Sequence, residues 1–373
     1  FDGCLDTPVE VLHVFLLGVV KYLVGDFMQG VQPAVIPIIM AHYQSFSTDG
    51  LNIPLLQPYY LTRHFTNFIR KDYKIVLQAA PFVLFEYMDE SNCMIWTSLC
   101  QLVPLVFQTH IEDMDTYQHI LKLHIGEFLY HLMMLTAQWM NKPKFHMLLH
   151  LPDAILCFGP PPLYATEKFE SYNGIFRNAS IHSNQNSPGK DIGHAFGDFQ
   201  NLRHLYFGGV AGEQHKVRIQ SIPAAGPREL YQQLPDFHLV QLAGYSLNPK
   251  DVIRDGSFVL YKSNNDSDET ELGRVEHVWE ARKPGRVLHY ICLTRFKLSG
   301  VDSFYNMREV CNSGQGKFIN ARNLRALVNV QHNCHKANYV ITFTKAKRVE
   351  RQETSKRTAL KCRFATSFKQ NLS

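Results

Sequence analysis

Apolar residues recur at helical spacing through the first 208 residues. A helix is expected to begin at Thr7-Pro8-Val9-Glu10, because Thr7 can cap it, Pro8 suits its first turn and Glu10 can close a capping box. One apolar face of this helix carries Val9, Leu12, His13, Leu16, Leu17 and Val20. Further helices are expected around 31–48, 73–88, 93–110 and 114–140. Several are apolar on nearly every side, which predicts burial within the fold.

The pattern changes after residue 143. Phe145 to Leu151 is expected to form a short helix, which Gly159-Pro160-Pro161-Pro162 ends. Another amphipathic helix should begin near Thr166. Residues 209–247 are rich in Gly, Pro and Gln and are expected to form a linker. The basic segment 345–373 is expected to be a solvated, disordered tail.

Residues 248–344 alternate between apolar and polar positions, which predicts strands. The strands are expected at 257–261, 273–278, 287–293 and 339–343, with a polar loop at 264–271. The predicted fold is therefore α+β and multidomain, with a mostly helical region over 1–208 and a small, separate, barrel-like β domain.

Composition is that of a globular protein, since 45% of residues are hydrophobic and 19% are charged. The net charge of +5 is concentrated at the carboxy-terminal end, where 345–373 holds nine Lys and Arg against two Glu. Lys345, Lys347 and Arg348 there suit nuclear import or contact with DNA phosphates, and a merely solvated tail is an equal alternative.

Two further features bear on the compartment. The eight cysteines are scattered without a CxxC pair, which indicates a reducing environment. The apolar run from Val11 to Gly25 is interrupted by His13 and Lys21, and we expect it to be too short and too polar to span a membrane.

Glu170 is the leading candidate for chemistry. Glu170 and Arg177 are seven residues apart and should share one helix face. A carboxylate and a cation along one groove suit an enzyme that binds a divalent metal ion together with a phosphate backbone. On spacing alone, a solvated helix surface explains the same pair.

Two histidine-containing segments are candidate metal sites. His146 and His150 stand at i and i+4 and could bind one ion, although core or helix-end histidines are the favoured interpretation. The run His332-Asn333-Cys334-His335 contains three ligand types. These lie too close along the chain to surround one tetrahedral zinc ion.

Three ordered blocks resemble transposases of the CACTA (En/Spm-like) group of DNA transposons. They are Glu10-Val11-Leu12-His13 with Leu16 to Lys21, then Lys71 to Gln78, then His146, His150, Phe158-Gly159, Phe169-Glu170 and Arg177. The resemblance implies the helical insertion and last helices of an RNase H-like fold, with Glu170 as the final acid of an Asp-Asp-Glu site. It further implies Mg²⁺ or Mn²⁺ at Glu170, transposon-end DNA near Arg177, a nuclear location and assembly of several copies. The family's two aspartates precede the first block, so they are expected to lie before Phe1.

Residues 250–340 resemble, more loosely, the bromo-adjacent homology (BAH) chromatin module. The resemblance rests on Gly256 to Tyr261, Gly273-Arg274-Val275, Tyr290 to Phe296 and Arg308 to Cys311. It implies a chromatin contact, and an accessory β domain with no reader function is equally compatible. Two functions therefore remain open: a transposase-derived DNA-processing protein, or a non-catalytic nuclear protein that binds chromatin or other proteins.

Overall fold

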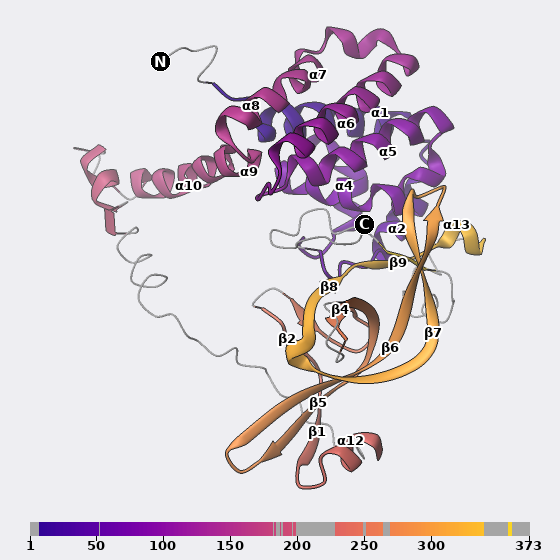
Figure 1. The fold of residues 1–373 in the computed structure, drawn as a ribbon. Helices are drawn as coiled ribbons and strands as arrows, with labels where there is room; N and C mark the ends of the chain where they lie inside the picture. The colour runs from indigo at the N-terminus through magenta and orange to yellow at the C-terminus, as the bar shows by residue number, and fades with distance from the viewer. Residues whose placement is uncertain are drawn as a thin grey trace.

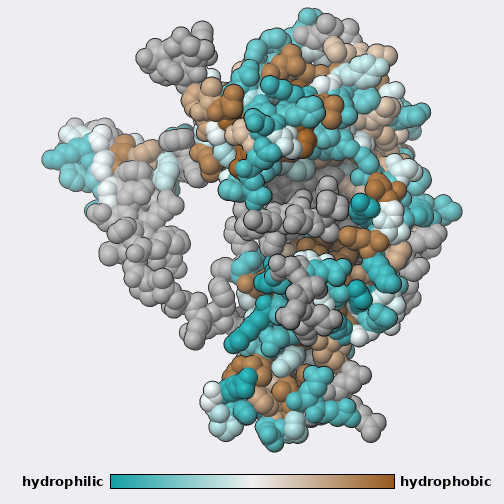
Figure 2. Space-filling model, viewed as in Figure 1, coloured by the Kyte–Doolittle hydropathy of each residue, from teal (hydrophilic) through white to brown (hydrophobic). Residues whose placement is uncertain are grey.

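The computed structural model describes residues 7–51, 53–181, 183, 187, 189–195, 197–198, 228–248, 251–263, 269–338 and 357–359. Within these residues the fold is α+β, as predicted. Helices make up the earlier part of the chain and an antiparallel sheet makes up the later part (Figure 1). In the view of Figure 2 most of the described surface is hydrophilic, with separate hydrophobic patches over both parts.

The helical part contains every long helix of the described residues. Its elements are η1 (Leu12–Val20), α1 (Lys21–Gly30), α2 (Ile36–Ser45), α3 (Pro58–Arg63), η2 (Phe65–Asn67), α4 (Arg70–Val83), η3 (Phe85–Tyr87), α5 (Glu90–Val106), α6 (Met114–Leu135), η4 (Ala137–Asn141), α7 (Pro143–Met147), η5 (Leu148–His150), α8 (Leu151–Phe158), α9 (Pro161–Tyr164) and α10 (Glu167–Ile181). The helices predicted from periodicity are confirmed as α2, α4, α5 and α6, with ends shifted by a few residues.

The first helix differs from its prediction in start and in geometry. It begins at Leu12, beyond Thr7 and Pro8, so Thr7 does not cap it. Instead Glu10 accepts hydrogen bonds from the backbone N–H groups of Leu12 and His13, both at 2.9 Å. The stretch Leu12–Val20 is a π-helix, whose wider turn spreads apolar residues around the axis. The predicted single face is therefore wrong: Phe15 and Val19 are buried, while His13 is exposed.

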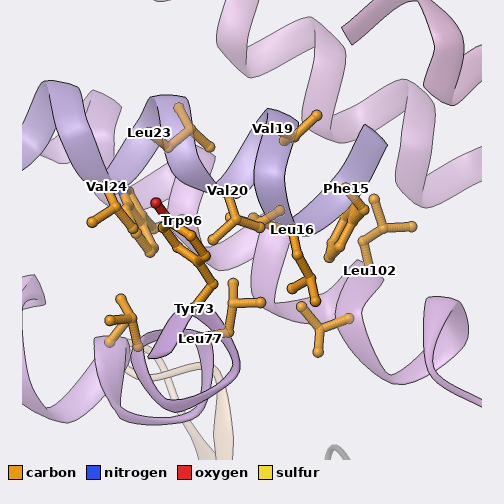
Figure 3. Close-up of a cluster of buried hydrophobic side chains, with 14 of the residues drawn as sticks. Phe15, Leu16, Val19, Val20, Leu23, Val24, Tyr73, Leu77, Trp96 and Leu102 are labelled. Carbon is orange, nitrogen blue, oxygen red and sulfur yellow. The ribbon is translucent and has the colours of Figure 1, made fainter. Parts of the chain in front are cut away.

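The η1–α1 helix is the centre of the helical core. Its side chains point toward α4 and α5, where Phe15, Leu16, Val19, Val20, Leu23 and Val24 meet Tyr73, Leu77, Trp96 and Leu102 (Figure 3). Burial of this apolar surface is the main stabilising contribution of the element.

The same helix bears on the membrane prediction. Over Leu12–Gly30 it runs for 19 residues and is long and apolar enough to cross a membrane, so the sequence-based estimate of its length was too short. More than half of its apolar stretch, 56%, is buried against other helices of the protein. Burial of that extent is typical of a core helix.

The later part is built on an antiparallel sheet. Its elements are α12 (Arg228–Gln233), β1 (His238–Leu242), β2 (Tyr245–Ser246), β3 (Val252–Ile253), β4 (Phe258–Lys262), β5 (Thr270–Lys283), β6 (Arg286–Asp302), β7 (Met307–Asn320), η6 (Ala321–Asn323), β8 (Leu324–Val328), β9 (Val330–His332), α13 (Cys334–Ala337) and β10 (Arg357–Ala359). The strand order is β8-β4-β5-β6-β7-β10-β9, with β1 on β5 and a separate β2–β3 pair. The predicted strands at 273–278 and 287–293 lie within β5 and β6, and the one predicted at 257–261 matches β4 with a shift of one residue.

Several boundaries of the β-rich part differ from the sequence-based ones. The segment 209–247, expected to be a linker, contains α12, β1 and β2, and β1 pairs with β5 from His238 to Leu242. The expected loop 264–271 overlaps the start of β5, and the expected strand 339–343 lies outside the described residues. Residues 357–359 of the expected solvated tail form β10 between β7 and β9.

The two parts are not separate, contrary to prediction. Tyr305 and Met307 belong to the same buried cluster as the helical core, and the Tyr305 ring stacks on Phe82 with centroids 4.7 Å apart. A second contact joins the Ser47–Gly50 loop to the bend between β8 and β9. There the buried Asn329 amide donates to the Ser47 and Asp49 carbonyls at 2.8 and 2.6 Å. The helices and the sheet are therefore joined by buried contacts, while most buried residues of the sheet pack in clusters of their own.

Candidate functional site

Glu170 lies in the first turn of α10, beside the start of two other helices. The backbone N–H of Glu170 donates to the Thr166 carbonyl at 2.9 Å, which closes this turn. Its Oε1 is 3.3 Å from His13 Nε2 and its Oε2 is 3.3 Å from Arg70 Nη1. The carboxylate remains 39% exposed. Glu170 is thus a half-exposed acid with a cation or imidazole on each oxygen.

His13 connects Glu170 to a second carboxylate. Its Nδ1 is 2.7 Å from Glu10 Oε2, and its Nε2 faces Glu170. Glu10 also accepts the Thr166 N–H at 3.0 Å, which fixes the residue just before α10. A Glu–His–Glu chain therefore runs from the start of η1 to the first turn of α10. We name this chain, together with Arg70, the Glu170 cluster.

Basic side chains from two other helices surround the cluster. Arg70 Nη1 also donates to the Glu167 carbonyl at 3.2 Å, and Lys74 Nζ lies 2.7 Å from Glu167 Oε1. Lys144 Nζ donates to the His13 carbonyl at 2.8 Å. The first turns of α4 and α10 and the segment α7 thus meet at the start of η1.

Glu10 is the more tightly held of the two acids. Burial opposes its ionisation, but hydrogen bonds from the Leu12, His13 and Thr166 backbone and from the His13 ring outweigh it and lower its pKa. Nearby, burial and the charge of Glu10 raise the pKa of Tyr164 to about 12. Glu10 is therefore a permanent anion at neutral pH that orients His13.

The arrangement must be compared with what Mg²⁺ or Mn²⁺ would need. Both ions prefer oxygen ligands, and a two-ion site needs several carboxylates around one phosphate. Both Glu170 oxygens face His13 and Arg70, and within the described ranges no three His, Cys, Asp or Glu side chains are placed so that they could hold one metal ion. The described residues alone therefore do not fit a two-ion site.

Arg177 lies on α10 with Glu170, as predicted, and its side chain is exposed two turns further along. Figure 1 shows α10 extending away from the helical body. Lys345, Lys347 and Arg348, which the sequence suggests for contact with DNA phosphates, lie outside the described residues.

The two histidine-containing segments differ in outcome. His146 and His150 are exposed residues at the ends of α7 and η5, as the helix-end alternative expected, and their Nε2 atoms are 3.3 Å apart. In the other segment, His332 Nδ1 lies 3.1 Å from Cys334 Sγ, whereas the His335 ring stacks on Phe304 with centroids 3.9 Å apart. His335 is thus held by the Phe304 ring, which agrees with the argument against zinc at this run.

Sequence reasoning missed Arg70, Lys74, Lys144 and Glu167 as neighbours of Glu170. Lys74 was part of the second resemblance block, and Arg70 directly precedes that block. The periodicity of α4 could have placed Arg70 and Lys74 on one face, since they are four residues apart. Nothing in the pattern could have matched that face to α10.

Comparison with known proteins yields one family match. Residues 214–363 match the family described as "Domain of unknown function (DUF8590)". This match covers the β-rich part and begins inside the segment first taken for a linker. No curated protein and no solved structure matches the chain.

Proposed function

We propose that this chain is a transposase-derived DNA-processing protein of the CACTA type, in which Glu170 is one metal-binding acid of a site for phosphodiester hydrolysis and strand transfer. Mg²⁺ or Mn²⁺ would supply charge neutralisation at the scissile phosphate. Glu170 alone cannot hold two ions, so the reaction requires carboxylates in addition to the described ones, and the described residues by themselves should be inactive.

The observation that carries this proposal is the convergence of the three resemblance blocks at Glu170. Glu10 and His13 come from the first block, Arg70 and Lys74 border or belong to the second, and Glu170 belongs to the third. Glu10 and Thr166 are 156 residues apart, and Arg70 and Glu170 are 100 apart. The three blocks were identified by their order along the chain, and in the fold their residues meet around Glu170, the acid that the resemblance makes catalytic.

The nucleic-acid contact is proposed along α10 and the basic tail. Arg177 lies exposed on the face that carries Glu170, and a phosphate there would lie within reach of both residues. The tail residues Lys345, Lys347 and Arg348 would add contacts without sequence preference, and their contribution should fall steeply with salt.

For the β-rich part we propose a barrel-like, BAH-like module that contacts chromatin in the nucleus. Support comes from the two ends of the strand path, β8 and β9, which are consecutive in the chain with only Asn329 between them. A short connection of this kind between the two edge strands is what a barrel-like arrangement would need.

A non-catalytic nuclear interaction protein is the second candidate. It is favoured by the pairing of Glu170, since both of its oxygens already face positive or imidazole partners. In that case the Glu170 cluster attaches α10 to the helical body and takes no part in a reaction.

Cleavage of labelled DNA ends in Mn²⁺ separates the two candidates. Wild-type protein should bind the DNA, and protein that also carries the further carboxylates required by this proposal should cleave it. Glu170→Gln should abolish cleavage but leave binding intact, whereas the matched control Glu167→Gln should retain cleavage. Equal cleavage by Glu170→Gln would remove Glu170 from the site, and binding without any cleavage would favour the non-catalytic candidate.

A further inference from the structure

Two exposed histidines on the α7–η5 segment present their ring nitrogens to each other. His146 lies in the last turn of α7 and His150 ends η5, one helical turn later. Their Nε2 atoms are 3.3 Å apart, and the ring centroids are 5.1 Å apart with planes at 74°. This pair is not in contact with any residue of the Glu170 cluster through a described hydrogen bond or ion pair.

The backbone between the two histidines is fixed by the core. Phe145 and Leu148 are buried, with Phe145 against the rings of Trp139 and Phe128. Lys144, next to them, is tied to the His13 carbonyl. Because one side of this segment is anchored, its opposite side holds His146 and His150 at a set separation, which reduces the ordering cost of binding a ligand between them.

The distance between the Nε2 atoms of His146 and His150 matches that between two ligands of one tetrahedral metal ion. Zinc–nitrogen bonds of about 2.0–2.1 Å at a tetrahedral angle place the two nitrogens about 3.3 Å apart. A direct hydrogen bond between the rings would be at the long end for an N–H donor, whose usual range is about 2.7–3.2 Å. A shared cation therefore accounts for the spacing better than a shared proton does.

We propose that His146 and His150 form a surface site for one transition-metal ion of the Zn²⁺, Co²⁺ or Ni²⁺ class. Both Nε2 atoms serve as ligands, and water fills the remaining positions. No third His, Cys, Asp or Glu joins them among the described residues, so the site is open and unlike a closed four-ligand structural zinc site. Imidazole ligands favour these ions over Mg²⁺, which prefers oxygen.

Titration of untagged protein with Co²⁺, followed by calorimetry and visible absorption, tests the site. The chain has 18 histidines, so the informative quantity is the difference between variants. His146→Ala and His150→Ala should each weaken the tightest Co²⁺ step by about tenfold or more, since loss of even an outer-shell partner costs about 10–100-fold in affinity. The matched control is His119→Ala, which removes an exposed histidine of α6 that has no imidazole neighbour in the described contacts.

Further measurements separate loss of the metal site from loss of folding. Circular dichroism and metal-free thermal unfolding should match wild type for all three variants, because each side chain is exposed. Excess Mg²⁺ should not displace Co²⁺ from the two imidazoles, because Mg²⁺ prefers oxygen ligands, and this result does not depend on whether the protein cleaves DNA. Equal Co²⁺ affinity in wild type and both His146→Ala and His150→Ala would overturn the proposal.

Discussion

Glu10 and Glu170 lie on opposite sides of the His13 ring and differ in burial. The Glu10 side chain is 14% exposed and accepts three backbone N–H bonds, whereas Glu170 is 39% exposed and accepts none among the described contacts. An acid with backbone donors contributes to folding, while one paired only with flexible side chains contributes little. The two residues therefore allow stability and activity to be separated experimentally.

Glu10→Gln should lower the free energy of unfolding by about 1–3 kcal/mol at neutral pH, because hydrogen bonds to a charged acceptor are lost. The folded-state pKa of Glu10 lies below its ordinary value of 4.5, so its stabilisation is fully present above 4.5 and is lost as pH falls through the lower folded value. Urea unfolding of wild type and variant at neutral and acidic pH measures this. A difference that persists unchanged in acid would contradict it.

Glu170→Gln should change stability by less than about 1 kcal/mol, because half-exposed ion pairs are weak. Chemical denaturation of Glu170→Gln beside wild type checks this directly. A small effect means that any loss of DNA cleavage in this variant reflects chemistry. A loss well above that magnitude would show instead that Glu170 mainly supports the attachment of α10.

Among the elements, the η1–α1 helix contains two glycines, Gly18 and Gly25, whose surroundings differ in how closely they pack. Gly18 in η1 is tightly enclosed: an added Cβ would lie 2.9 Å from the His13 carbonyl oxygen and 3.0 Å from the Lys144 side chain. Gly25 in α1, on the same continuous helix, has nothing within 4 Å of an added Cβ. The π-helical turn therefore depends on a small residue where α7 crosses it.

Gly18→Ala should destabilise the protein by about 1–3 kcal/mol, because the methyl group would force the backbone or Lys144 to move. Gly25→Ala should instead stabilise it by up to about 1 kcal/mol, through the higher helix propensity of alanine. Thermal unfolding of the two variants gives opposite shifts in Tm. Stabilisation by Gly18→Ala would show that the turn can relax to an ordinary α-helix.

In the whole molecule, the helices and the sheet are joined by a few buried polar groups beside the shared apolar cluster. Gln331 donates to the Ser47 carbonyl at 2.7 Å and accepts the Ser47 N–H at 3.1 Å, across 284 residues of sequence. Gly50, with φ of +70°, lies against the β8–β9 bend, where an added Cβ would be 3.0 Å from the Asn329 nitrogen. These contacts predict that the two parts unfold together.

Asn329→Ala should therefore destabilise the whole protein by about 1–3 kcal/mol, since the Ser47 and Asp49 carbonyls lose a buried donor. Hydrogen exchange should rise first in the Ser47–Gly50 loop and in β9. The control Gln315→Ala, on an exposed position of β7, should leave exchange unchanged. Loss of protection confined to the β-rich part would contradict joint unfolding.

The sequence by itself determined the elements whose signal is local. Apolar spacing predicted α2, α4, α5 and α6, and alternation predicted β4, the middle of β5 and the first half of β6, since each pattern reflects the faces of a single element. It did not predict β7, because Asn312 to Gly316 reads as a polar turn. In the fold, Asn312 and Gly316 pair with Phe296 and Thr294 of β6, and Gly314 adopts φ of +70° where the register shifts between these pairs.

Only the tertiary structure decided which residues meet. Glu170 was chosen from the order of blocks along the chain, but its partners Arg70 and His13 are supplied by helices distant in sequence. Likewise, β1 joined the sheet and Tyr305 joined the helical core despite their predicted assignment to a linker and a separate domain. The physical reason is that periodicity fixes which face of an element is buried, whereas the element that covers this face depends on packing over the whole chain.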